Sequence, residues 1–170
     1  FRFNWPNKRK NLVIFGIKLY YYSMTDLIIL THSTLRYFIF VFLLILLYRS
    51  FQGWQNKSDF TATDNKVSLW LFILTHSQLL LGLILYFVSP LVIFDGASMK
   101  NAVARYWLVE HITMMLIAVV LITMARVTAK KMTDAVAKHK RLFIFNLIAL
   151  IFIVAAIAMS GRGFFSFPEI

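Results

Sequence analysis

Four long apolar runs constrain the fold of this chain more than any other feature of its sequence. Each run is long enough to cross the hydrocarbon core of a bilayer as a helix, which takes about 20 residues. In lipid an open sheet would leave its edges unsatisfied, and no run shows the alternation of a barrel strand. The sequence therefore predicts an all-α, integral membrane, antiparallel four-helix bundle. The predicted spans are Leu27–Tyr48, Val67–Val88, Tyr106–Ala125 and Leu142–Met159.

The composition agrees with this class and excludes several chemistries. Of the 170 residues, 60% are hydrophobic, whereas soluble domains are about half apolar. The chain has no cysteine, which excludes disulfides, thiolate-held iron–sulfur clusters and the covalent attachment of a c-type haem. It also has no Gly-rich nucleotide loop, nucleophile elbow or zinc-binding H-E-x-x-H motif. We therefore expect a single membrane domain over residues 24–170 and no stand-alone enzyme.

The basic residues predict partners and orientation. The formal net charge is +11, and the cations gather beside the apolar runs, where topology and anionic lipid headgroups account for them. We therefore expect the lipid bilayer, and not nucleic acid, as the partner. Lysine and arginine are most frequent in the connectors 49–66 and 126–141, so the side that carries these connectors is predicted to be cytoplasmic. Both termini are then predicted to lie outside.

Residues 1–23 disturb this charge pattern. The stretch "FRFNWPNKRKNLVIFGIKLYYYS" adds basic residues on the side opposite to the two basic connectors. The sequence favours Met24 as the true start, with the preceding leader as an upstream reading-frame extension. The alternative is a basic, aromatic helix that lies in the membrane interface.

Histidines recur inside the apolar runs, and two of them reach the same depth. The phrase "ILTHS" occurs at Ile29–Ser33 and again at Ile73–Ser77. His32 lies about 7.5 Å below the membrane face at which its span begins, and His111 lies at the same depth below that face in the third span. The first and third helices of an up-down bundle face each other diagonally. We therefore predict that His32 and His111 hold one haem iron from its two faces, since neutral imidazole is a standard axial ligand.

The other two histidines, His76 and His139, are the alternative ligands of a second haem. They belong to the second and fourth spans, which form the other diagonal. His76 is about 13.5 Å inside its membrane face, whereas His139 precedes its span, so their depths differ by about 18 Å. A second haem is therefore less favoured than the first. The competing interpretation of each histidine is an interhelical hydrogen bond, and for His139 a solvated basic loop.

Arg36 lies one turn after His32 on the same helical face. A charge inside a span is costly and is usually functional or paired, so Arg36 is predicted to bind a haem propionate, or else to pair with Glu110 or Asp26. Other residues expected near the haem serve as propionate partners, as hydrogen-bond acceptors for imidazole, or as small residues that leave room for a macrocycle. They are Arg105, Arg162, Thr31, Ser33, Thr113, Gly82 and Ala155–Ala156.

Four stretches carry a resemblance to a known family: "THSTLRYF", "HSQLLLGLILYFVSP", "VEHITMMLIAVVLIT" and "KHKRLFIFNLIAL". From about Met24 to Arg162 the chain resembles small four-helix bacterial membrane proteins labelled cytochrome b or cytochrome b-like. "QLLLG" adds a fainter likeness to the helical halves of haem A synthases, and residues 1–23 lie outside the pattern. The resemblance implies a b-type cytochrome of the bacterial inner (cytoplasmic) membrane that binds haem b. Its candidate axial ligands are His32, His76, His111 and His139.

Three functions remain open on the sequence. The first is an electron carrier that passes electrons between a quinol and another redox subunit through haem b. The second is a haem-free accessory or assembly subunit, in which the histidines and Arg36 join helices as polar packing residues. The third is a small proton or ion conduit, with His32, Glu110, His111 and Arg36 as the relay.

Overall fold

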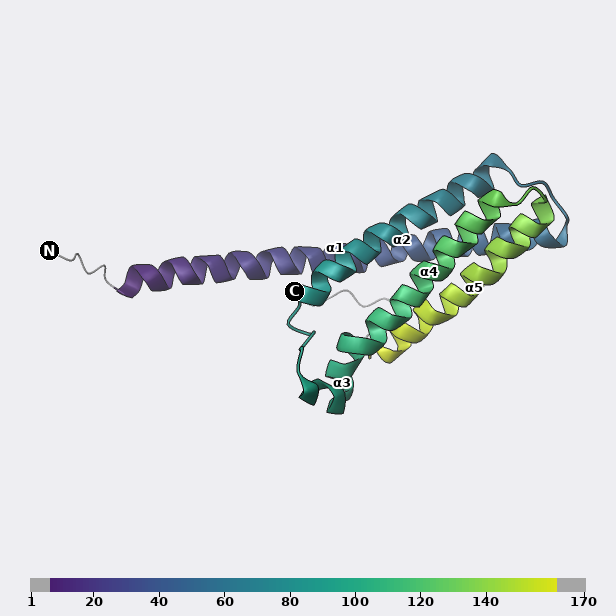
Figure 1. Ribbon diagram of the computed structural model, residues 1–170. Helices are drawn as coiled ribbons and strands as arrows, with labels where there is room; N and C mark the ends of the chain where they lie inside the picture. The colour runs from purple at the N-terminus through teal and green to yellow at the C-terminus, as the bar shows by residue number, and fades with distance from the viewer. Residues whose placement is uncertain (1–6, 162–170) are drawn as a thin grey trace.

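The computed structural model describes residues 7–161, and it describes side chains from Met24 to Gly161. Within that part of the chain every regular element is helical (Figure 1). The elements are α1 (Asn7–Gln55), α2 (Ala62–Val88), the 3-10 turn η1 (Gly96–Lys100), α3 (Ala102–Arg105), the π-helical turn η2 (Tyr106–Glu110), α4 (His111–Lys131) and α5 (Ala135–Met159).

Four helical stretches are long and apolar enough to cross a membrane. They are Met24–Gln55, Ala62–Val88, Ala102–Lys131 and Ala135–Met159. They run alternately up and down side by side, while the beginning of α1 projects beyond the bundle (Figure 1). The predicted all-α, four-helix membrane bundle is therefore confirmed, and the chain is a multi-pass membrane protein.

The helices pack in a square that places α1 and α4 on one diagonal. α4 packs most extensively on α5, and α1 on α2; the square is closed by α1 against α5 and α2 against α4. The centre is filled by aliphatic residues and by alanines, whose small side chains let helices approach closely in lipid. The most deeply buried of them are Leu43, Leu46, Leu71, Ile122, Ala125, Leu142 and Ala149.

The connection from α1 to α2 is held by a cap and an ion pair. Thr61 is the N-cap of α2, its hydroxyl accepts a hydrogen bond from the Asp64 N–H, and the Asp64 carboxylate accepts one from the Thr61 N–H. The Arg49 Nε atom lies 2.7 Å from the Asp64 carboxylate. Thr61 is therefore the N-cap, and Asp64 occupies the third helical position of a capping box.

The basic connector between the last two spans is mostly helical. α4 continues to Lys131 and α5 begins at Ala135, capped by the Asp134 side chain, so residues 132–134 alone separate them. The lysines at the end of α4 favour this extension, because cations stabilise a helix C-terminus. The solvated-loop interpretation of His139 is wrong, because His139 lies one turn into α5 and is 2% exposed.

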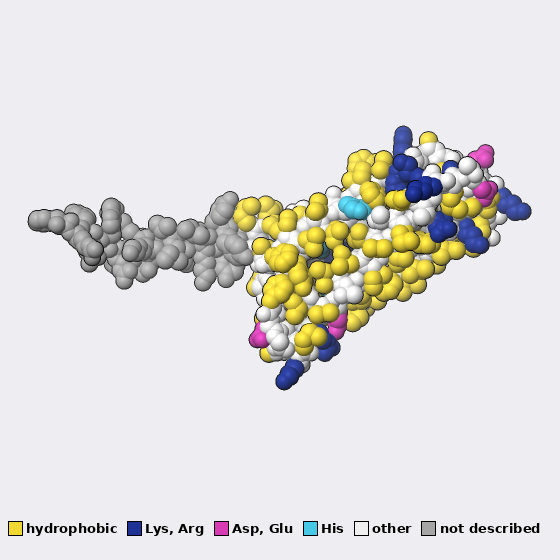
Figure 2. Space-filling view, viewed as in Figure 1, with side chains coloured by type: hydrophobic (Ala, Val, Ile, Leu, Met, Phe, Trp, Pro, Cys, Tyr) yellow, Lys and Arg dark blue, Asp and Glu magenta, His cyan; other side chains and the backbone are white. Residues whose placement is uncertain are grey.

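The outer surface separates apolar from charged side chains. Hydrophobic side chains cover the middle of the bundle, and lysine and arginine gather at the end that carries the α1–α2 and α4–α5 connections (Figure 2). Large side chains such as Phe38, Trp70, Phe87 and Ile151 are more than half exposed. This distribution is the one expected of helices whose outer faces meet lipid.

Candidate functional site

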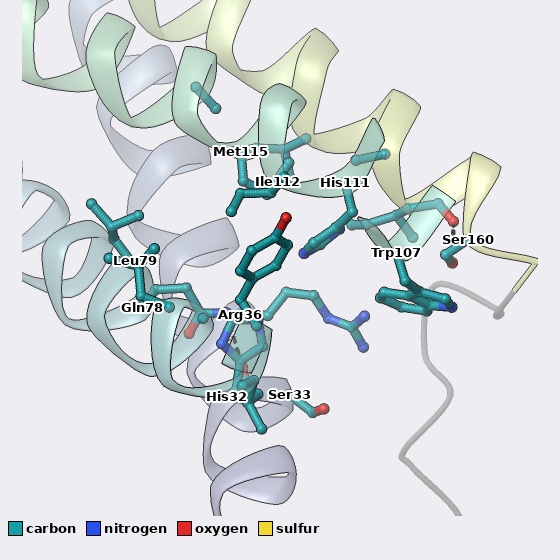
Figure 3. A pocket seen from close by; sticks show the side chains of 18 of the residues that line it. His32, Ser33, Arg36, Gln78, Leu79, Trp107, His111, Ile112, Met115 and Ser160 are labelled. Carbon is teal, nitrogen blue, oxygen red and sulfur yellow. Dashed lines mark hydrogen bonds between the residues drawn. The ribbon is translucent and has the colours of Figure 1, made fainter. Parts of the chain in front are cut away.

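A cavity of about 280 Å³ opens among the four long helices, at the end of the bundle away from the basic connections. Its volume is near the lower end of the range of small-molecule pockets, roughly 300–1,000 Å³. α1 contributes His32 and Arg36, α2 contributes Gln78, and α4 contributes His111 (Figure 3). Three of the five predicted site residues therefore share one cavity, and most of the surface around them is apolar.

A π-helical turn orients His111. The turn Tyr106–Glu110 ends where the backbone N–H of His111 donates to the Tyr106 carbonyl, five residues earlier. In an ideal α-helix, residues five apart point about 140° away from each other. The wider turn instead brings the Tyr106 hydroxyl to 3.3 Å from Nδ1 of His111. Such single π turns are frequent at functional sites.

The hydrogen bonds of Tyr106 assign the tautomer of His111. The Tyr106 hydroxyl donates its one proton to the Ala156 carbonyl of α5, at 2.6 Å, because that carbonyl can only accept. Nδ1 of His111 must then carry a proton and donate it to the tyrosine oxygen. The lone pair of His111 is left on Nε2, which is the arrangement of a metal-binding imidazole held by an outer hydrogen bond.

His32 lies against the backbone of α2. A Cβ atom added at Gly82 would lie 3.2 Å from Cε1 of His32 and 3.8 Å from its Nδ1, so a glycine is what lets the ring approach. Gln78, one turn before Gly82, donates from Nε2 to the His32 carbonyl at 2.9 Å. Nδ1 of His32 is buried and has no hydrogen-bond partner among the residues that the structure describes.

Arg36 extends along the same cavity, one turn beyond His32 (Figure 3). Its Nη2 donates to the Tyr37 hydroxyl at 3.1 Å, and its guanidinium lies 5.0 Å from the centre of the Tyr37 ring. Glu110, which the sequence offered as its partner, is paired with Nε of Arg105 at 2.7 Å. Arg36 is therefore held at the cavity by an aromatic neighbour, and Glu110 and Arg105 form a separate pair.

The remaining two histidines lie elsewhere. His76 does not line the cavity, and its Nδ1 is 2.8 Å from the Phe72 carbonyl of its own helix. His139 is packed against Gly53 of α1, and its Nε2 is 3.4 Å from the Asp59 carbonyl. None of the contacts or cavities in the described part of the chain brings His76 and His139 together.

The expected outer partners are also distributed differently. Ser33 lines the cavity, but the Thr31 hydroxyl bonds the Leu27 carbonyl of its own helix and Thr113 is exposed. Ala156 contributes a backbone carbonyl as well as a small side chain. Arg162 lies outside the described residues.

Sequence reasoning missed Tyr106 and Gln78. On the sequence Tyr106 marks only the start of a span, because a spacing of five from His111 does not place two residues on one face of an α-helix. A signal for Gln78 was present: it is a polar amide inside an apolar run, one turn before Gly82. Polar side chains at such positions commonly bond across helices.

No family model, curated protein or solved structure matches this chain. In the described part of the chain no group of three or more His, Asp or Glu side chains could hold a metal ion. The cavity wall there carries two imidazoles, those of His32 and His111.

Proposed function

We propose that this protein is a membrane b-type cytochrome-like electron carrier with one haem b bound between His32 and His111. One observation carries the proposal: two histidines from diagonal helices line a single, mainly apolar cavity. The resemblance to small four-helix cytochrome b-like proteins points to the same cofactor. When bound, haem supplies a one-electron redox couple whose potential depends on the axial ligands and their surroundings.

The side chains around the cavity have separate tasks in this proposal. His111 offers Nε2 as ligand because Tyr106 holds its Nδ1–H, and such outer hydrogen bonds fix the orientation and raise the basicity of a ligand. His32 is the second ligand, and Gly82 leaves space beside it. Arg36, which lines the same cavity, would bind a propionate.

The electron donor and acceptor in this proposal are a quinol and another redox subunit. The membrane is the bacterial cytoplasmic membrane, with the basic end of the bundle in the cytoplasm and both termini outside. This orientation follows from the excess of lysine and arginine at that end.

A haem-free accessory subunit is the second candidate. It is favoured by two interhelical hydrogen bonds at the cavity, from Gln78 to the His32 carbonyl and from Tyr106 to the Ala156 carbonyl. Both bonds join neighbouring helices without needing a cofactor. In this case the histidines would be packing residues, and the protein would co-purify with a larger complex.

The deciding experiment is a reduced-minus-oxidised spectrum of detergent-purified protein from haem-replete cells, with haem quantified as the pyridine haemochrome. We expect a b-type alpha band at one haem per chain. His32→Ala and His111→Ala should each abolish it, while His76→Ala, a matched histidine outside the cavity, should retain it. A colourless, folded preparation would overturn the cytochrome proposal, and equal loss in all three variants would overturn the assignment of His32 and His111 as its ligands.

A further inference from the structure

A second cavity, of about 320 Å³, lies at the basic end of the bundle. It is lined by the first turns of α2, the end of α4 and the beginning of α5. Its charged side chains are Arg126, Lys130 and Lys138, and no carboxylate lines it. Asn65 and Ser68 add neutral polar groups. The cavity therefore presents positive charge and hydrogen-bond donors with no counter-charge of its own.

Arg126 is the buried centre of this cavity. It is 8% exposed, and its Nη1 donates to the Ser68 hydroxyl, to the Asn65 carbonyl at 3.2 Å and to the Asn65 side-chain oxygen at 3.4 Å. All of these acceptors are neutral. Within the described residues the ion pairs are Arg49–Asp64 and Arg105–Glu110, so the Arg126 guanidinium has no carboxylate partner there.

An unpaired buried charge is costly, whereas a buried charge that meets an anion is compensated. The bonds to Asn65 and Ser68 occupy Nη1 alone. Nε and Nη2 of Arg126 remain as donors, and two adjacent guanidinium donors match the oxygens of a phosphate.

The two lysines surround Arg126 from different helices. Lys130 is in the last turn of α4 and is exposed, whereas Lys138 is in the first turns of α5 and its Nζ lies 5.4 Å from the centre of the Phe60 ring. Phe60 also lines the cavity. This contact places the Lys138 ammonium at the wall of the cavity.

The first turn of α2 adds a further positive contribution. Thr61 and Ala62 line the cavity at the N-terminal end of this 27-residue helix. The helix dipole makes such an end favourable for anions, while the capping box occupies the N–H groups of Thr61 and Asp64. The nearby Asp64 carboxylate does not line the cavity, because it is bound to Thr61 and Arg49.

We propose that this cavity binds a phosphate group, and that the phosphate belongs to the headgroup of an anionic phospholipid. The cavity lies where three membrane-spanning helices begin or end, which is the level of lipid headgroups. Basic pockets between helices on one side of a membrane bind such headgroups. The proposal does not depend on haem, since the two cavities share no lining residue.

The test places the purified full chain in phosphatidylcholine nanodiscs that contain a minor fraction of phosphatidylglycerol, and counts the retained phosphatidylglycerol by native mass spectrometry. Arg126→Gln, and separately the double variant Lys130→Gln/Lys138→Gln, should weaken retention at least about tenfold. Lys140→Gln removes one positive charge at the same end but outside the cavity. It should weaken retention less than about twofold.

A second arm adds inorganic phosphate to nanodiscs of phosphatidylcholine alone and measures the thermal unfolding midpoint. A midpoint raised by phosphate in the wild type but not in Arg126→Gln, with no retained phosphatidylglycerol in the first arm, would overturn the lipid source and assign a soluble phosphate. Equal loss of lipid in Lys140→Gln and the cavity variants would overturn the site itself. The lysine double variant keeps the test decisive if Arg126→Gln fails to fold, because neither lysine is buried.

Discussion

Polar side chains are arranged differently at the two ends of the bundle. At the histidine end, the imidazoles of His32 and His111, two phenols and the Arg36 guanidinium line a mainly apolar cavity, and the phenols donate to backbone carbonyls. At the basic end, Arg126 and two lysines line a polar cavity. Each end holds a guanidinium, but the Arg36 group lies against the Tyr37 ring, whereas the Arg126 group is bonded to Asn65 and Ser68. One bundle therefore carries a mainly apolar cavity at one end and a polar, positively charged cavity at the other.

Replacing a glycine by alanine should reduce stability most at Gly53, which lies at the basic end of the bundle. A Cβ atom at Gly53 would overlap the His139 ring, which is itself buried. We expect Gly53→Ala to reduce the free energy of unfolding by about 1–3 kcal/mol through overpacking. Unfolding in detergent measures this loss. Adding His139→Ala should restore part of it, and an unchanged stability of Gly53→Ala would contradict the close approach of α1 and α5.

The second largest effect is expected at the cap of α2. Asp64→Ala removes both the capping-box carboxylate and the partner of Arg49. The loss should be about 1–2 kcal/mol in the free energy of unfolding. The control is Lys66→Ala, because Lys66 is exposed and lies two residues after Asp64 in the same helix. The cap would be dispensable if both variants unfolded at the same detergent concentration.

At the histidine end, Tyr106→Phe should cost about 1 kcal/mol of stability, because the Ala156 carbonyl loses one of its two donors and keeps only the Ser160 N–H. If haem is bound as proposed, its affinity should also fall about tenfold, since the outer partner of His111 is removed. Haem titration of the apoprotein measures this.

Tyr86→Phe is the matched control for Tyr106. Tyr86 also lines the cavity, and its hydroxyl donates to a backbone carbonyl, that of Leu108, at 3.0 Å; its hydrogen bond and ring contacts with other described residues involve no histidine. A comparable stability loss with unchanged haem affinity is expected. Equal haem affinities in the two variants would show that the Tyr106 hydroxyl stabilises the fold but does not support His111 as a ligand.

The smallest effect is expected at Gly82. A Cβ atom there would meet Cε1 of His32 at 3.2 Å, a contact that a shift of a few tenths of an ångström relieves. The gain in helix propensity, about 1 kcal/mol, should nearly offset that strain, so Gly82→Ala should change stability by less than about 0.5 kcal/mol. A loss as large as that of Gly53→Ala would remove the contrast between the two ends.

The arrangement of the histidines was partly predictable. Spans counted from the apolar runs placed His32 and His111 at one level on the first and third helices, and both line one cavity. Counting failed for His139, because it assumed that the helix starts where the charges end. α5 instead begins at Ala135, and His139 turns into the bundle against Gly53.

Hydrophobic run length by itself determined that this chain is a four-helix membrane protein, because backbone groups in lipid must be satisfied within each helix. The sequence also determined the concentration of cations at one end. Only the tertiary structure decided that Tyr106 reaches His111, through a π turn that no residue pattern predicts, and that Arg126 is buried with no carboxylate partner among the described residues. Both depend on how neighbouring helices pack, and packing joins residues whose separation along the chain carries no signal of contact.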